Sequence, residues 1–253
     1  MDVEKSFSKV QRTEPISRVL GYLKGASDVL PMVFDGKKCY GFIDERLFIS
    51  TKLDTNQQIK GFDVRAKTMD ESKSASEIAE EMLRSYCSYA PFGKNEKEKS
   101  IEGYIKASTV IRELLKEKSS GKNAELLAKP VIALKKDDTI GKAINFLKNF
   151  RAVPIVDEKG MLYGCVEQRG NILDLLADRE RPRQGAYVST KEERVFKKPV
   201  VNYSTKFAPK CDVNSAIDEN LVGIMDTYGY CFVCRDNKPI GILTPPDILK
   251  VLV

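Results

Sequence analysis

The sequence predicts an α/β protein built from repeats of one helix–strand–strand–helix unit. Two observations indicate this. Residues 138–174 change from helical to strand periodicity and back within one short segment, and residues 213–253 repeat the same order. A unit this small cannot bury both of its faces alone, so we expect the units to pack in pairs.

The first of these two segments begins with a helix whose apolar positions recur at i, i+3, i+4 and i+7: Ile140, Ala143, Ile144 and Leu147. Asp137 and Asp138 stand just before it and are expected to cap its free N–H groups. The segments that follow are a buried strand, a turn, a return strand and a final helix: 152–156, 157–160, 161–166 and 172–176. Asn171 is expected to cap that final helix.

The second segment follows the same plan. Its helical stripe consists of Val213, Ala216, Ile217, Leu221 and Ile224. A strand over 230–234, a turn over 235–238 and a strand over 240–243 lead to Thr244-Pro245-Pro246-Asp247, which opens a helix to the end of the sequence. The residues before each segment also agree, Lys129-Pro130-Val131 and Lys198-Pro199-Val200.

These residues carry a resemblance to the cystathionine-β-synthase (CBS) domain family. Ala152-Val153-Pro154-Ile155-Val156-Asp157 is similar to the family's central strand motif, and Asp138-Thr139-Ile140 lies close to its early motif. The stretch from Gly241 to Ile248 matches the late motif, Gly-hydrophobic-hydrophobic-Thr-x-x-Asp-hydrophobic. The resemblance implies paired units related by pseudo-twofold axes, an arrangement called a Bateman module.

The first half of the chain repeats the plan with weaker motifs. Ile16, Val19, Leu20 and Leu23 form one helical stripe, and Ile78, Ala79, Met82 and Leu83 form another, capped by Ser74 or Ser76. We predict hairpins with strands at 29–34 and 39–43, and at 86–92 and 101–105, a polar linker over 51–61, and a closing helix over 110–118.

We therefore predict four CBS units, at 1–60, 61–120, 121–178 and 198–253. They pair as module 1 (1–120) and module 2 (121–253), with a flexible boundary over 119–123 and a basic connector at 178–198. The resemblance covers essentially the whole chain. The four-unit γ subunit of the AMP-activated kinase is an analogy for this architecture.

Composition excludes several function classes. The 253 residues are 42% hydrophobic and 31% charged, and no apolar run approaches the roughly 18 residues of a membrane span. The first residues show no secretory signal, so we expect a cytoplasmic protein. There is no histidine, which excludes Ser-His and Cys-His catalytic pairs. We find no P-loop or other catalytic motif, and expect no enzyme and no catalytic cofactor.

The six cysteines have irregular spacing, so a disulfide framework is not expected. Cys231 and Cys234 form a CxxC, but they fall in a predicted strand. Residues three apart in a strand point to opposite faces and cannot easily share a metal. We predict buried, inert thiols and no metal site.

The ligand site implied by the resemblance lies at the start of the last helix. There Asp247 accepts hydrogen bonds from ribose hydroxyls and Thr244 lies near the phosphate, with Pro246 between them. The base pocket comes from the neighbouring unit, near Ile132 and at Phe150, Arg151 and Ala152. A helix N-terminus suits phosphate. The same residues also read as an ordinary helix cap, and the two roles are compatible.

The equivalent slots of the other units depart from the motif. They hold Leu47, Thr109 and Gly170 in place of the carboxylate, and Asn171 is a partial substitute. We therefore expect at most one or two ligands per chain.

The leading hypothesis is a regulatory protein that senses AMP, ADP, ATP or S-adenosylmethionine in module 2. It would pass its state to an effector protein or to a second copy, as a homodimer. The alternative is a scaffold that binds nucleic acid through the basic connector, helped by the net charge of +6. A charged segment of this kind also reads as a solvated connector.

Overall fold

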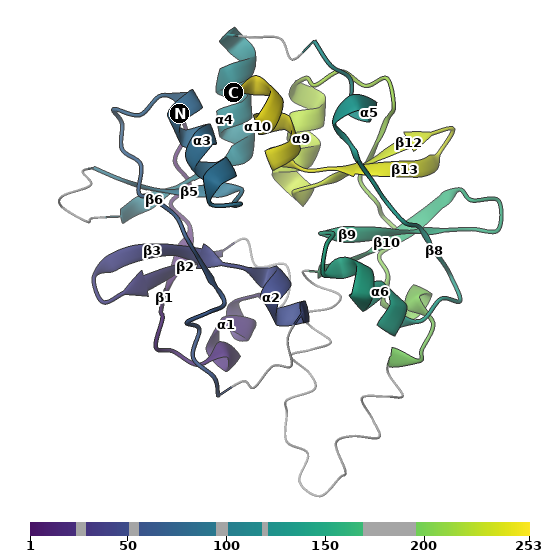
Figure 1. Ribbon diagram of the computed structural model, residues 1–253, viewed down its shortest axis with the longest axis horizontal. Coiled ribbons are helices and arrows are strands. Elements are labelled where there is room, and N and C mark those ends of the chain that lie inside the picture. Colours follow the sequence, from purple (N-terminus) through teal and green to yellow (C-terminus); the bar gives the residue numbers. More distant parts are fainter. Residues whose placement is uncertain (24–28, 51–55, 95–100, 118–120, 169–195) are drawn as a thin grey trace, which may run out of the picture.

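Four units, each with a helix followed by a two-stranded hairpin, surround a common centre (Figure 1). Within the described residues, units one, two and four also have the closing helix. The computed structural model describes residues 1–23, 29–50, 56–94, 101–117, 121–168 and 196–253. The predicted α/β repeat architecture is confirmed. Asn171, the helix predicted over 172–176, and most of the basic connector at 178–198 lie outside the described residues. None of the described helices is long and apolar enough to cross a bilayer.

Unit one forms around a buried helix face and a hairpin. Its elements are β1 (Phe7–Gln11), α1 (Ile16–Leu23), β2 (Leu30–Asp35), β3 (Lys38–Ile43) and α2 (Glu45–Ser50). The predicted apolar stripe of α1 is wholly buried, as its spacing requires. The segment predicted as a polar linker also contributes to the core, because Ile59 is fully buried and its N–H donates to Glu14 O.

Unit two begins with the strand β4. Its elements are β4 (Asp63–Arg65), α3 (Ala75–Arg84), β5 (Tyr89–Gly93), β6 (Ile101–Lys106) and α4 (Ala107–Glu117). Ser74 caps α3 in a reciprocal capping box with Glu77. The strand predicted from Tyr86 starts three residues later, because Tyr86 adopts a left-handed conformation with φ of 52°. The closing helix begins at Ala107, before the predicted Val110.

Unit three contains α5 (Ala124–Leu127), β7 (Lys129–Pro130), β8 (Leu134–Lys135), α6 (Ile140–Leu147), β9 (Ala152–Val156) and β10 (Leu162–Glu167). The prediction that Asp137 and Asp138 cap α6 is wrong. Thr139 is the N-cap and accepts from Lys142 N–H. Asp138 instead accepts the N–H of Lys135, which closes the turn before the helix.

Unit four contains η2 (Val200–Tyr203), β11 (Lys210–Asp212), α9 (Glu219–Tyr228), β12 (Cys231–Arg235), β13 (Lys238–Leu243) and α10 (Pro245–Leu252). The helix predicted from Val213 is shorter than its apolar stripe. Asp218 caps α9, so Val213 and Ile217 are buried from the preceding loop. Val213, Ile217 and Leu221 of the predicted stripe are buried, whereas Ala216 is exposed, and a capping carboxylate sets the helix start.

The units exchange backbone within pairs. The second strand of each hairpin is here called the return strand. The return strands of units one to four are β3, β6, β10 and β13, in that order. Each accepts a short segment, here called the lead-in, from another unit: β4 on β3, Glu4 on β6, Thr205 on β10 and β7 on β13. The matching tripeptides Lys129-Pro130-Val131 and Lys198-Pro199-Val200 are not equivalent, because Pro199 instead bridges Thr139.

A glycine lies on every return strand where the lead-in approaches. A Cβ added to Gly103 would lie 2.2 Å from Glu4 O, and one added to Gly164 would lie 2.3 Å from Thr205 O. At Gly41 the distance to Val64 O would be 1.9 Å. Gly241 would meet Ala128 Cβ at 2.8 Å. Only a residue without a side chain admits the crossing backbone at these positions.

Four apolar clusters join the units in a ring. One joins units one and two around Phe42 and Tyr104, and another joins units three and four around Tyr230 and Phe232. The two larger clusters cross between the halves of the chain. They join unit one to unit three and unit two to unit four, the latter through contacts of α4 with α9 and α10. The exchanged lead-ins support 1–120 and 121–253 as the two modules, and we propose this division.

We expect Gly103→Ala and Gly164→Ala each to destabilise the protein by about 1–3 kcal/mol or more, the usual cost of forcing atoms into a packed region. Gly21→Ala is the matched control. It lies in α1 with nothing within 4 Å of the added methyl group, so it should be neutral or stabilise by about 0.5–1 kcal/mol. Urea unfolding of the three variants measures this. Equal midpoints for all three would contradict the close-approach argument.

Candidate functional site

The carboxylate of Asp247 lies at the entrance to α10 and closes a capping box with Thr244. The Thr244 N–H donates to Asp247 Oδ2 at 3.0 Å, and the Thr244 hydroxyl bonds the same oxygen. Pro245 and Pro246 occupy the first helical positions, where no N–H donor is needed. One oxygen of Asp247 is therefore committed to its own helix, and the residue is 6% exposed.

The other oxygen of Asp247 is bound by a side chain from unit three. Lys129 Nζ lies 2.8 Å from Asp247 Oδ1. Pairing of β7 with β13 places Lys129 opposite Ile242 and so brings it to the start of α10. The lysine side chain is 56% exposed whereas that of Asp247 is 5% exposed. A partly solvated ammonium can move into water at small cost, which would open Oδ1 to another donor.

The residues predicted to form the base pocket lie in different environments. Ala152 is fully buried in the cluster between units three and four, and Phe150 packs at the edge of that cluster and of the one between units one and three. Ile132 is 53% exposed, an available apolar side chain two residues beyond β7. The structure thus brings Thr244 and Asp247 together and places Ala152 in the core.

Arg151 lies where elements of all four units meet. Its Nη1 donates to Gly229 O of unit four at 3.3 Å. Burial acts against its charge, but the hydrogen bond with Tyr89 and the nearby Glu45 carboxylate outweigh that effect and raise the pKa of Arg151 above its ordinary value. The guanidinium therefore stays charged and links the two halves of the chain.

Gly229 is required beside Arg151 for two reasons. It ends α9 in the left-handed conformation with φ of 72°. A Cβ at this position would lie 2.5 Å from Arg151 Nη1. Tyr86 has the same kind of conformation at the matching turn of unit two, where its side chain is 79% exposed and meets no such obstacle.

The equivalent slot of unit two is filled by contacts with unit four. Ser108 Oγ donates to Asp226 Oδ1 at 2.7 Å, and Lys106 Nζ lies 3.5 Å from the same oxygen. In unit one, Arg46 holds Asp44 through two hydrogen bonds of 2.8 and 2.9 Å. These slots carry structural contacts in place of a free carboxylate at the motif position.

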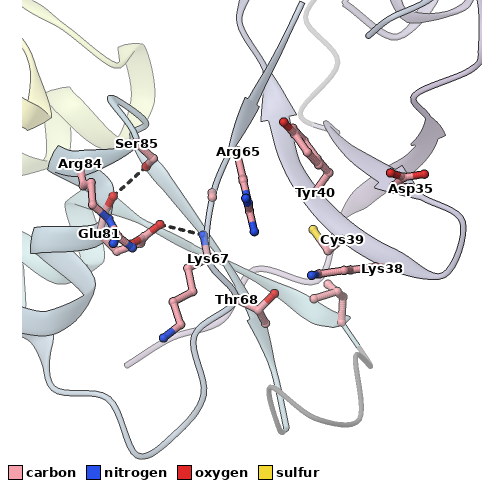
Figure 2. A pocket seen from close by; sticks show the side chains of 12 residues that line it. Asp35, Lys38, Cys39, Tyr40, Arg65, Lys67, Thr68, Glu81, Arg84 and Ser85 are labelled. Carbon is pink, nitrogen blue, oxygen red and sulfur yellow. Dashed lines mark hydrogen bonds and ion pairs between the residues drawn. The ribbon is translucent and has the colours of Figure 1, made fainter. Parts of the chain in front are cut away.

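A cleft of about 770 Å³ lies between units one and two (Figure 2). Sequence reasoning missed it, because its walls come from scattered segments with no shared motif: Asp35, Lys38, Cys39, Tyr40, Arg65, Ala66, Lys67, Thr68, Glu81, Arg84, Ser85 and Ile101. Glu81 is buried, accepts the Lys67 N–H at 2.7 Å and pairs with Arg84, so it fixes one wall of the cleft to the crossing segment.

The cysteine that lines the cleft is a poor nucleophile. Burial raises the pKa of the Cys39 thiol, which lines the cleft, to about 12, so it stays protonated at neutral pH. Cys231 and Cys234 are both buried in β12. Within the described parts of the chain, no group of three or more cysteine, aspartate or glutamate side chains is placed to hold a metal ion.

Residues 124–169, which run from α5 through β10, match the sequence model of the CBS domain family. This segment of the chain is therefore similar to a CBS domain. A comparison with curated protein sequences found no significant match. Two solved structures resemble the chain over nearly its whole length.

The first is protein MJ1225 of Methanocaldococcus jannaschii, a proposed archaeal homologue of g-AMPK. It has 18% identity and a TM-score of 0.73, covering 99% of this chain and 98% of its own. The second is an uncharacterised conserved protein of Pyrococcus horikoshii, with 20% identity and a TM-score of 0.57, covering 91% and 94%. At these identities the similarity establishes a shared fold.

We expect Gly229→Ala to destabilise the protein by about 1–2 kcal/mol from the left-handed backbone alone, and further by displacing Arg151. Tyr86→Gly is the opposite control. It places a glycine at an exposed residue that already has the left-handed conformation, so the variant should be as stable as the wild type or slightly more stable. Thermal unfolding of both variants tests this. A Gly229→Ala protein as stable as wild type would show that Arg151 has no fixed place beside it.

Proposed function

We propose that this protein is a regulatory CBS-domain sensor that binds an adenosine-containing ligand, AMP, ADP, ATP or S-adenosylmethionine, at the start of α10. The observation that carries the proposal is the buried carboxylate of Asp247, of which Oδ1 is bound by the partly exposed Lys129. A vicinal diol needs a fixed acceptor, and Oδ1 becomes one when the lysine swings into water. The capping box holds the carboxylate in place meanwhile.

Ligand binding at Asp247 would affect the packing of other units, because the residues involved also contact those units. Lys129 belongs to the lead-in β7, which pairs with β13, and Arg151 of the same unit forms hydrogen bonds with units two and four. A ligand that displaces Lys129 would alter how unit three sits on unit four. It shifts the protein between states only if it binds one of them more tightly. An effector protein or a second copy of the chain would then bind one arrangement of the two modules more tightly than the other.

The site favours this function over catalysis. The described partners of Asp247 hold it as a helix cap and a counter-ion: the Thr244 hydroxyl and N–H close the capping box, and the Lys129 ammonium forms an ion pair. The nucleic-acid alternative depends on the basic connector, most of which lies outside the described residues. No observation on the described residues favours it.

We expect AMP, ADP, ATP or S-adenosylmethionine to raise the unfolding temperature of the wild type. At a concentration of 100 Kd the stabilisation is about 2.7 kcal/mol, equivalent to roughly 5–10 °C for a chain of this size. Asp247→Asn should weaken binding about 10- to 100-fold, because it removes a hydrogen bond to a charged acceptor. Glu158→Gln removes the same charge from an exposed turn and should bind normally. Differential scanning fluorimetry of the wild type, Asp247→Asn and Glu158→Gln measures these shifts in unfolding temperature.

Lys129→Ala tests whether the Lys129 ammonium competes with the ligand for Asp247 Oδ1 or instead attracts the ligand phosphate. If the ammonium occupies the ligand's place on Oδ1, removing it should strengthen binding, whereas a lysine that contacts the ligand phosphate would weaken binding when removed. No thermal shift of the wild type with any of the four ligands would reject the sensor, and an equal shift in Asp247→Asn would place binding elsewhere.

A further inference from the structure

The cleft between units one and two is enclosed by three segments of the chain. Its volume of about 770 Å³ lies within the roughly 300–1,000 Å³ typical of small-molecule sites. One wall is the β2–β3 hairpin, the second is the segment that follows β4, and the third is the end of α3 with β6 (Figure 2). The buried Glu81 ties the second wall to the third through Lys67 N–H.

The charges of the cleft are unbalanced. Its lining includes the cations Lys38, Arg65, Lys67 and Arg84, and the carboxylates Asp35 and Glu81. Both carboxylates already have cationic partners: Glu81 pairs with Arg84, and Asp35 lies 3.7 Å from Arg12 Nη1 outside the lining. Neither Lys38 nor Arg65 forms an ion pair with any carboxylate in the described segments. The described lining of the cleft therefore carries an excess of positive charge.

Two of these cations converge. In Figure 2 the ends of Lys38 and Arg65 and the hydroxyl of Thr68 point toward one region of the cleft, from the hairpin on one side and the crossing segment on the other. Like charges directed at the same space repel each other unless an anion lies between them. A guanidinium fork with an ammonium and a hydroxyl is a donor set suited to a phosphate group.

We propose that this cleft is a second binding site, for a small organic phosphate. Arg65, Lys38 and Thr68 bind the phosphate group, and the apolar body of the ligand lies against Ala66 and Ile101. The site differs in chemistry from the start of α10. Leu47 stands in the carboxylate position of unit one and packs against the core, so there is no equivalent acceptor for a sugar diol. The proposal does not depend on adenosine binding at Asp247.

The test uses the full-length chain and phenyl phosphate, which has an apolar body and no diol, with inorganic phosphate for comparison. Isothermal titration at low ionic strength should show that phenyl phosphate binds more tightly than inorganic phosphate and that added salt weakens the binding. Arg65→Ala and Lys38→Ala should each weaken it at least tenfold, and Arg65→Lys should retain part of it.

Two controls locate the binding. Lys250→Ala removes one exposed positive charge from α10 and should leave phenyl phosphate binding unchanged. Asp247→Asn should also leave it unchanged, even if that variant loses adenosine ligands. Because Arg65 and Lys38 are exposed, their variants should unfold at the wild-type temperature, which shows that lost binding is not lost folding.

Four results would overturn the proposal. The first three are the absence of phenyl phosphate binding to the wild type at millimolar concentration, binding that survives in the Lys38→Ala/Arg65→Ala double variant, and binding lost in Asp247→Asn. Inorganic phosphate bound as tightly as phenyl phosphate would also overturn it, because the apolar wall would then contribute nothing.

Discussion

The four-unit arrangement depends on a close backbone contact at a glycine in each return strand. At Gly41, Gly103 and Gly164 the crossing carbonyl oxygen lies within 2.3 Å of where a Cβ would stand. This approach lets one unit complete the sheet edge of another without an intervening side chain. The apolar clusters between units then form on either side of the exchanged segments. Neighbouring units are thereby joined by backbone hydrogen bonds as well as by apolar contacts.

Much of the fold was predictable because its elements follow local rules. The helical stripes of α1, α3 and α6 and the hairpins of all four units come from periodicities of 3.6 and 2 residues. The errors lie where a single polar group or a tertiary contact decides a boundary. Asp218 starts α9 later than the apolar stripe predicts, and Thr139 takes the capping role expected of Asp138. Local periodicity carries no information about such choices.

The candidate sites were less accessible from the sequence. Thr244 and Asp247 were predicted because they lie in a short continuous motif that resembles the late motif of the CBS family. The pairing of Lys129 with Asp247 depends on the register of β7 against β13, residues more than 100 positions apart. The cleft between units one and two is even harder to predict from the sequence. Its cations are spread over separate segments and meet only because β4 crosses from unit two to unit one.

The exchange of segments within each pair also determines how the chain can be divided. Cutting between units one and two would leave β3 without β4 and β6 without the backbone around Glu4. Each severed unit would present an open strand edge beside a bare glycine, and an edge of this kind recruits an identical segment from another molecule. Fragments made at this boundary would therefore associate by three-dimensional domain swapping. Fragments cut between residues 120 and 121 keep both exchanges of each pair within one polypeptide.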